Sequence, residues 1–271
     1  MALQTETKLN AHREPVIRVR DFVATYDGRT VLKDVSFEVF PGEIVVLAGG
    51  SGCGKSTMLK HMVGLYEPTG GAIDVDGRNV ATVAGDERHE LLRSFGVTFQ
   101  GGALFGSMSV LENVRLPLEE FTNLPREAMD IIALSKLALV GLESAAGLLP
   151  SQISGGMQKR AAVARAMAMD PKILFLDEPS AGLDPITSAE LDQLILDLRK
   201  LLGMTFVVAT HELASIFAIA DRCVVFDGSK KTVVMIDSPQ RLRDQTENPW
   251  VHAFFNRQRP EAAAGKVPVI S

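Results

Sequence analysis

The feature that most limits the fold of this chain is a glycine-rich loop between an apolar run and a helical stretch. The run Ile44–Leu47 contains no polar residue, which is typical of a strand buried on both faces. Residues Lys55–Leu65 have helical spacing. Between them lies the pattern Gly-x-x-x-x-Gly-Lys-Ser, which binds phosphate groups where it joins a strand to a helix. We therefore predict a phosphate-binding loop made of Gly49, Gly50, Ser51, Gly52, Cys53, Gly54, Lys55 and Ser56.

The chemistry of this loop predicts ATP with Mg²⁺ as its ligand. Glycines let the backbone approach closely, so that its N–H groups point at phosphate oxygens, and the following helix adds its positive N-terminal end. Lys55 is expected to reach the β- and γ-phosphates, Ser56 to ligate Mg²⁺, and Thr57 to add a phosphate contact. The alternative, a glycine-rich turn that matches by chance, does not account for the strand and the helix on either side.

Two acidic residues follow a second apolar run. Asp177 and Glu178 come directly after Ile173–Leu176. In open α/β sheets, ligands bind at the carboxyl ends of the strands. We predict that Asp177 holds Mg²⁺ through a water and that Glu178 orients and polarises the attacking water. The alternative is that both acids only cap a strand end. An ATP bound at the phosphate loop, however, would give both acids a ligand to act on.

The composition narrows the class of protein. With 271 residues, 46% of them hydrophobic, the chain can form one large domain with its own core. Its net charge of −5 argues against a nucleic-acid partner, because nucleic-acid binders carry a basic surface. Two cysteines are too few for a disulfide framework. Cys223 opens an apolar run and is expected to be a buried, reduced thiol.

Membrane segments are not expected in this chain. No apolar run approaches the roughly 20 residues that a membrane-spanning helix needs. The stretch Met1–Pro15 lacks the apolar segment of a secretory signal. We therefore expect any link to a membrane to come through a partner.

The order of the predicted elements indicates an α/β fold. Val16–Val23 and Val31–Phe40 read as two antiparallel strands, and the stretch from about 103 to 168 has helical periodicity and no convincing strand. Elsewhere strands and helices alternate, which predicts a mostly parallel sheet with helices on both faces. In the second strand, four residues are expected to share the buried face: Val31, Val35, Phe37 and Val39.

Further motifs resemble those of the ATP-binding subunits of ATP-binding-cassette (ABC) transporters. Ser154-Gly155-Gly156-Met157-Gln158 resembles the family's signature sequence, with Ile153 in place of the usual leucine before it. Gln100 resembles the Q-loop glutamine, and Ser180–Asp184 resembles the D-loop. His211 resembles the switch histidine, and Tyr26 the aromatic residue that stacks on adenine. Taken singly, each has an ordinary reading as a turn, a cap or a packed side chain, but here they occur in the family's order.

This resemblance implies a P-loop NTPase with the ABC ATPase fold: a RecA-like core, an antiparallel β subdomain and an inserted α-helical subdomain. It implies that Gln100 joins Ser56 and Asp177 at Mg²⁺. It also implies that His211 holds the γ-phosphate and links it to Glu178. The signature of one copy would serve the ATP of a second, head-to-tail copy, so that two ATPs lie in a dimer. The residues that the resemblance implies for contact with the ATP of the other copy are Ser154, Gly155, Gly156, Gln158 and Asp184.

Several segments resemble those of the ATPases of MCE-type lipid transporters, including the Mla system. They are residues 99–105 and 113–125, Asp184–Thr187 and Asn248–Phe255. This implies an integral membrane permease, a periplasmic MCE-type lipid-binding protein and a position on the cytoplasmic face of the bacterial inner membrane.

One alternative to lipid transport is an importer ATPase for a polar solute such as an amino acid. A non-transport ABC ATPase is disfavoured, because the chain has one cassette and no long coiled-coil insertion.

The expected domain organisation has three parts. Residues 1–15 form a flexible arm, and 16–246 form the ABC ATPase domain, with the helical subdomain at about 103–168. Residues 247–271 form a C-terminal helix and tail. In this last part, Trp250, Phe254 and Phe255 are expected to pack either on a neighbouring subunit or on the chain's own core.

Overall fold

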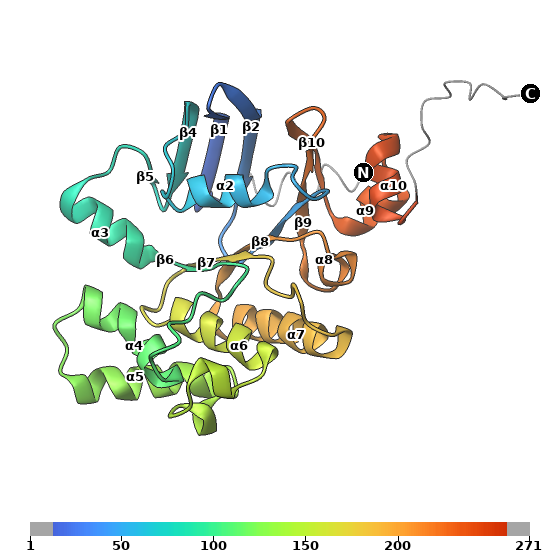
Figure 1. Ribbon diagram of the computed structural model, residues 1–271. Coiled ribbons are helices and arrows are strands. Elements are labelled where there is room, and N and C mark those ends of the chain that lie inside the picture. The colour runs from blue at the N-terminus through green and yellow to red at the C-terminus, as the bar shows by residue number, and fades with distance from the viewer. Residues whose placement is uncertain (1–12, 259–271) are drawn as a thin grey trace, which may run out of the picture.

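A six-stranded sheet lies at the centre of the structure, a computed structural model that describes residues 13–258 (Figure 1). Five neighbouring strands are parallel, and the edge strand β10 is antiparallel to β9, so the predicted, mostly parallel sheet is confirmed. In sheet order, the strands are β10 (Thr232–Asp237), β9 (Arg222–Asp227), β3 (Ile44–Ala48), β8 (Thr205–Ala209), β7 (Ile173–Asp177) and β6 (Phe95–Thr98).

The three central strands are buried on both faces, which explains why their sequences are continuously apolar. Successive side chains alternate between two cores. Val45 and Leu47 face one core, whereas Ile44 and Val46 face the other. Buried Cys223 belongs to this second core, as predicted, and burial raises the pKa of its thiol.

A second, antiparallel sheet covers one face of the central sheet, together with helix α2 (Lys55–Met62). Helix α3 (Gly85–Ser94) leads from this side into β6. Helix α2 stops before the predicted Leu65, because Gly64 has a φ of 70° and ends the helix. In order, the strands of the second sheet are β2 (Arg29–Val39), β1 (Ile17–Tyr26), β4 (Gly70–Val75) and β5 (Arg78–Asn79).

One prediction about β2 is wrong. Val31 is only partly buried, and Leu32 takes its place on the inner face with Val35. The pairing moves from Val35 opposite Phe22 to Leu32 opposite Ala24, so β2 has one more residue than β1 in this interval. This extra residue is a β-bulge, and Asp34 has a φ of 53° there. A strict alternation could not predict the change of face.

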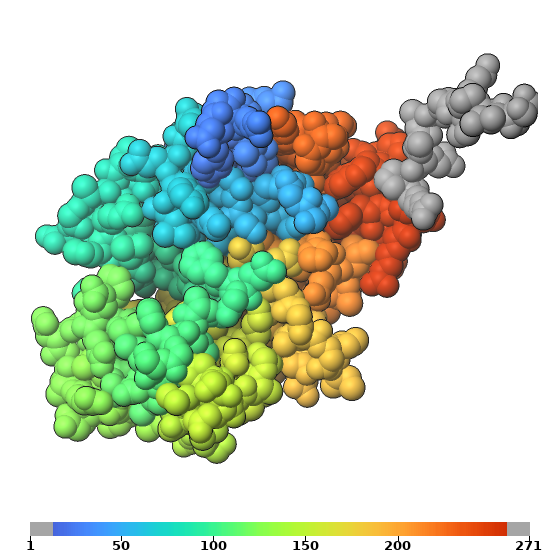
Figure 2. Space-filling model, viewed as in Figure 1, coloured from blue at the N-terminus to red at the C-terminus, as the bar shows by residue number. Residues whose placement is uncertain are grey.

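Helices cover the other face of the central sheet, and the lower end of the molecule is helical (Figure 1). Figure 2 shows the same stretch, coloured green to yellow, as the lower part of the molecular surface. Within residues 103–168, all of which the structure describes, there is no strand, as predicted. This stretch contains two 3₁₀ turns (Glu143–Ala145 and Pro150–Gln152) and three helices: α4 (Val110–Phe121), α5 (Arg126–Leu139) and α6 (Gly155–Ala166).

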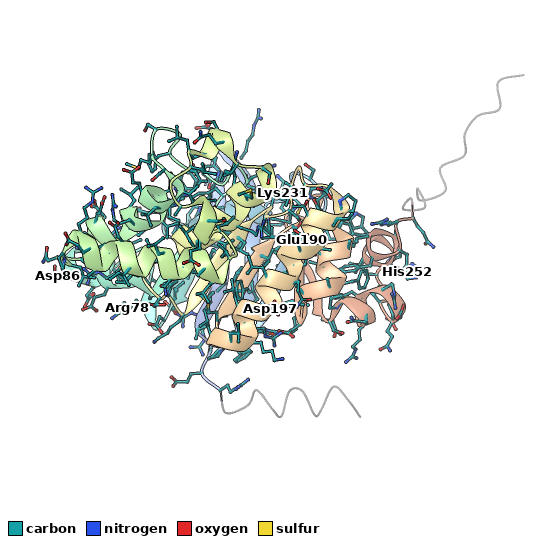
Figure 3. All side chains as sticks on the ribbon, turned by 90° about the horizontal axis from the view of Figure 1, so that it is seen from below. Arg78, Asp86, Glu190, Asp197, Lys231 and His252 are labelled. Carbon is teal, nitrogen blue, oxygen red and sulfur yellow. The ribbon has the colours of Figure 1, made fainter. Side chains whose placement is uncertain are left out.

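Helix α7 (Pro185–Leu202) and helix α8 (Leu213–Ile219) complete this layer. Leu191 and Ile195 of α7 are buried, whereas Glu190 and Asp197 lie on its outer side (Figure 3). This amphipathic pattern fixes which face of the helix meets the sheet.

The C-terminal helices α9 (Pro239–Asp244) and α10 (Pro249–Phe255) pack on the chain's own core. Phe255 is buried and meets Phe217 of α8 edge to face at 6.1 Å between ring centroids. Trp250 stacks on Phe254 at 5.7 Å. The second of the two predicted packings is therefore present. The predicted arm (residues 1–12 of it) and the tail 259–271 lie outside the described residues.

Among the helices described, none is both long and apolar enough to cross a membrane.

Candidate active site

The phosphate loop connects β3 to α2 and is shaped by Gly49 and Gly54, the first and last glycines of its Gly-x-x-x-x-Gly-Lys-Ser pattern. Gly49 has a φ of 147° and Gly54 a φ of 107°, conformations that favour glycine. A Cβ atom at Gly49 would lie 2.5 Å from the Phe226 carbonyl oxygen, and one at Gly54 would lie 2.8 Å from Leu32. Both positions therefore exclude any side chain. Cys53 packs beneath the loop, and burial raises the pKa of its thiol.

Lys55 is the cation of the loop. It begins α2, and its side chain is only 6% exposed. Its Nζ donates hydrogen bonds to the carbonyl oxygens of Gly49 (3.0 Å) and Gly50 (3.3 Å) and lies 3.6 Å from Glu178 Oε1. The ammonium group is thus enclosed by the loop. It faces a cavity of about 260 Å³ lined by Ser51, Gly52, Gly54, Lys55, Ser56, Thr57, Gln100, Glu178 and His211.

A hydroxyl and a carboxylate meet beside this cavity. Ser56 Oγ donates to Asp177 Oδ1 at 2.8 Å, which joins the start of α2 to the end of β7. Burial raises the pKa of Asp177, the negative charge of Glu178 raises it further, and the Ser56 hydrogen bond opposes both. Gln100 lines the same cavity. Hydroxyl, carboxylate and amide oxygens are ligands that Mg²⁺ takes in proteins, so these three residues fit that ion.

Glu178 stands at the end of β7 and is held from several sides. Its φ of 46° is unusual for a residue other than glycine, and its N–H donates to the Ala209 carbonyl at 2.8 Å. Its Oε1 lies 2.9 Å from His211 Nδ1, and its Oε2 accepts a 3.1 Å hydrogen bond from Thr210 Oγ1. The structure therefore brings Lys55, Glu178 and His211 together in the lining of one cavity.

Tyr26 lies at the end of β1 with an aromatic support that the sequence did not reveal. Its hydroxyl is 3.3 Å from Nε2 of His61, whose Nδ1 is 2.8 Å from the Thr57 carbonyl oxygen. The ring of Tyr66 meets that of Tyr26 edge to face at 5.9 Å. His61 lies six residues after Lys55 on α2, about 9 Å along the helix axis. The one sequence signal was the position of His61 on the helix that begins at the loop.

The signature segment lies at the start of α6 and does not line the cavity beside Lys55, called the phosphate cavity below. Helix α6 begins at Gly155, because Ser154 caps it by accepting the Met157 N–H at 3.2 Å. A Cβ atom at Gly156 would lie 2.4 Å from Thr187 of α7. Ser154, Gly155 and Gly156 are not among the residues that line the cavity described above.

Two other predicted residues have local structural contacts. Gln158 donates from Nε2 to the Pro150 carbonyl at 2.9 Å. Asp184 caps α7 by accepting the N–H groups of Ile186 and Thr187 at 3.0 and 3.1 Å. Both residues thus shape the turns that neighbour the signature segment.

Helix α6 also holds the backbone that follows Gln100, a contact that sequence reasoning missed. Lys159 donates to the Gln100 carbonyl, and Arg165 donates to the carbonyls of Gly102 (2.9 Å) and Ala103 (2.7 Å). The glutamine of the cavity and the signature helix of the same chain are therefore linked directly.

Comparisons with known proteins agree with this geometry. Residues 32–181 match the family model described as "ABC transporter". The chain is 37% identical to the intermembrane phospholipid transport system ATP-binding protein MlaF of Escherichia coli (strain K12), over 89% of this chain and 88% of that protein. It is also 37% identical to the probable ribonucleotide transport ATP-binding protein mkl of Mycobacterium tuberculosis, over 90% of this chain and 67% of that protein.

Solved structures share the fold. The chain cbiO1 from Clostridium perfringens, part of an ABC transporter complex, superposes with a TM-score of 0.78 at 28% identity, covering 86% of this chain and 92% of that one. The dimeric ABC transporter cassette MJ0796 superposes with a TM-score of 0.74 at 33% identity, covering 82% and 98%. The predicted core, antiparallel β subdomain and inserted helical subdomain are confirmed. This chain belongs to the ABC transporter family, as an ATP-binding subunit that hydrolyses ATP.

Proposed function

We propose that this chain binds Mg·ATP and hydrolyses it to drive phospholipid transport through a membrane permease. The observation that carries the proposal is the 37% identity to the phospholipid-transport ATPase MlaF along 88% of that protein's length. The segments around Gln100 to Pro125 support it, since they resemble lipid-transport ATPases. On this proposal the chain acts at the cytoplasmic face of a bacterial inner membrane, with an MCE-type lipid-binding protein on the periplasmic side.

The first step is nucleotide binding. The phosphates enter the cavity of the loop, where Lys55 turns from the loop carbonyls and Glu178 toward the β- and γ-phosphates. Adenine stacks on Tyr26, which is 37% exposed and oriented by His61. Ser56, Asp177 and Gln100 would hold Mg²⁺, which neutralises the charge that develops on the phosphates.

The second step is hydrolysis. Glu178 orients a water and polarises it for attack on the γ-phosphorus, while the bond from that phosphorus to the β–γ bridging oxygen breaks. His211, which is hydrogen-bonded to Glu178, holds the γ-phosphate. ADP and inorganic phosphate are the products. The contact between His211 and Glu178 supports this assignment. It lets His211 bind the γ-phosphate while the adjacent Glu178 binds the attacking water.

Each site needs a second copy of the chain. The signature segment begins α6 and lies outside its own chain's phosphate cavity. The free N–H groups at the start of a helix attract an anion. Asp184 and Gln158 keep the adjoining turns in place. In a head-to-tail dimer, Ser154, Gly155 and Gly156 would close over the γ-phosphate bound by the other copy.

The half-site arrangement predicts complementation between two inactive variants. Lys55→Ala disables the loop, and Gly155→Asp places a repelling carboxylate at the signature, where a Cβ atom meets nothing closer than 3.8 Å. A mixed dimer of the two retains one site with an intact loop and an intact signature. We expect ATPase activity in the mixture that neither variant has alone. Mixtures that stay as inactive as the separate variants would contradict a shared site.

An exposed apolar surface beside the first turn of α4 supports a docked partner. Phe105 is 52% exposed, and Leu148 and Leu149 are each 38% exposed. Both segments are bonded to the first turn of α4, Phe105 through Asn113 and Leu148 through the Val110 N–H. Apolar side chains grouped on a surface favour a protein contact. We propose that the permease docks here.

A second candidate cargo follows from the name of another relative. The mkl proteins, equally similar to this chain, are named for ribonucleotide transport. The cargo is tested by isolating the chain from membranes in mild detergent and identifying the subunits and the bound molecules. A permease with bound phospholipid supports the proposal. A permease with bound nucleotide or amino acid would replace it, and a chain that brings no membrane protein would overturn it.

A further inference from the structure

Thr210 is a buried residue between strand β8 and His211. Its side chain has no exposure to solvent. Its Oγ1 makes two hydrogen bonds: one of 3.1 Å to Glu178 Oε2 and one of 3.1 Å with the backbone N–H of Glu212. Nothing in the motifs discussed above assigns this residue a role.

The direction of both hydrogen bonds is fixed by chemistry. A backbone N–H can only donate, so Oγ1 of Thr210 accepts from Glu212. A carboxylate can only accept, so the single hydroxyl hydrogen of Thr210 points at Glu178 Oε2. The one hydrogen of the Thr210 hydroxyl is therefore used in the hydrogen bond to Glu178.

Thr210 is itself held in place. Its backbone N–H donates to the Leu47 carbonyl at 3.2 Å, which ties it to β3. The side chain of Glu212 accepts a 2.9 Å hydrogen bond from Ser180 Oγ, and Ser180 is buried. Residues on both sides of the threonine are therefore anchored, so its hydroxyl is a fixed donor rather than a rotating one.

We infer that Thr210 is a positioning residue for ATP hydrolysis, whose hydroxyl fixes the carboxylate of Glu178 in the orientation that serves the attacking water. With Oε2 held by Thr210, Oε1 is the oxygen that meets His211 at 2.9 Å and Lys55 at 3.6 Å. The terminal torsion of a glutamate is otherwise broad. Loss of the donor lets the carboxylate rotate away from the reacting water. This inference rests on the proposed role of Glu178.

The test is a pair of substitutions at Thr210. Thr210→Val keeps the shape of the side chain and removes the hydroxyl. We expect kcat to fall by about 10- to 100-fold, as for a lost hydrogen bond to a charged group, with the KM for ATP unchanged. Thr210→Ser keeps the hydroxyl, and its kcat should stay within about threefold of the parent. Thr210→Ala is the second hydroxyl-free variant, to be used where the valine variant does not fold.

Thr205 at the other end of β8 is a matched control. It is 2% exposed, and its Oγ1 accepts the backbone N–H of Gly42 at 2.9 Å, without any contact to Glu178. Thr205→Val therefore loses a hydrogen bond accepted from a backbone N–H, as Thr210→Val does at Glu212, but it loses none to a carboxylate. It should lower the melting temperature and leave kcat unchanged.

The outcomes separate this inference from the proposed function. A Thr210→Val variant with normal kcat, or a Thr210→Ser variant as slow as it, overturns the positioning role. A Thr205→Val variant that loses turnover to the same extent also overturns the positioning role. The loss of kcat would then come from lower stability of the protein and not from the orientation of Glu178. If Glu178→Gln also keeps its turnover, the assignment of Glu178 fails. If Glu178→Gln is inactive while Thr210→Val is normal, only the role of Thr210 fails.

Discussion

Glu178→Gln is expected to lower ATP turnover by about 10²- to 10⁴-fold, the usual contribution of a group that handles the proton of the reacting water. The substitution keeps the size of the side chain, so Thr210 can still donate to the amide oxygen. The neutral amide cannot accept the proton that the attacking water gives up. ATP binding should persist, because the loop around Lys55 is unchanged. Steady-state ATPase assays and nucleotide binding by calorimetry measure the two effects separately.

A second consequence of Glu178→Gln is a trapped dimer. Since ATP remains between two copies that cannot cleave it, we expect the variant to elute as a dimer with ATP and as a monomer without it. Glu43→Gln is the control, because Glu43 is also hydrogen-bonded, to Arg222 and the Phe40 N–H, but lies outside the phosphate cavity. A Glu178→Gln variant with near-normal turnover would refute the proposed role.

Lys55→Ala is expected to weaken ATP binding itself. The ammonium group is 6% exposed and surrounded by the loop carbonyls and Glu178, so it is already held where the phosphates enter. A hydrogen bond between a cation and a phosphate contributes about 1.5–3 kcal/mol, which corresponds to an affinity loss of about 10- to 150-fold. Calorimetry with ATP in excess Mg²⁺ measures the change.

The control for Lys55→Ala is Lys172→Ala. The side chain of Lys172 is 72% exposed and lies 3.5 Å from Asp76, so its removal tests the loss of one positive charge on the surface. We expect its ATP affinity to match that of the parent. Equal affinities for the parent and Lys55→Ala would rule out the assignment of the phosphate loop.

The sequence predicted the parts of the fold whose physical cause is local. Continuous apolar runs identified Ile44–Leu47 and Ile173–Leu176 as buried strands, because a strand covered on both faces has no position for a polar side chain. The glycine pattern identified the loop, since Gly49 and Gly54 have no room for a Cβ atom. The direction of the sheet followed from the alternation of strands and helices.

Features that depend on a bulge or on contacts between distant segments were not predictable. Val31 was assigned to the wrong face because the extra residue in β2 shifts the pairing only once β1 lies beside it. The contacts of Thr210 with Glu178 and of His61 with Tyr26 join residues 32 and 35 positions apart. Neither pair forms a pattern along the chain.

The complete burial of β3, β7 and β8 has a consequence for how the protein opens. Amide hydrogens in such central strands exchange with solvent only when the whole domain unfolds, whereas outer segments exchange through smaller fluctuations. The phosphate loop, Glu178 and His211 all leave from the ends of these three strands. The nucleotide site is therefore attached to the last part of the molecule to lose its hydrogen bonds, and its reacting groups stay aligned while outer segments fluctuate.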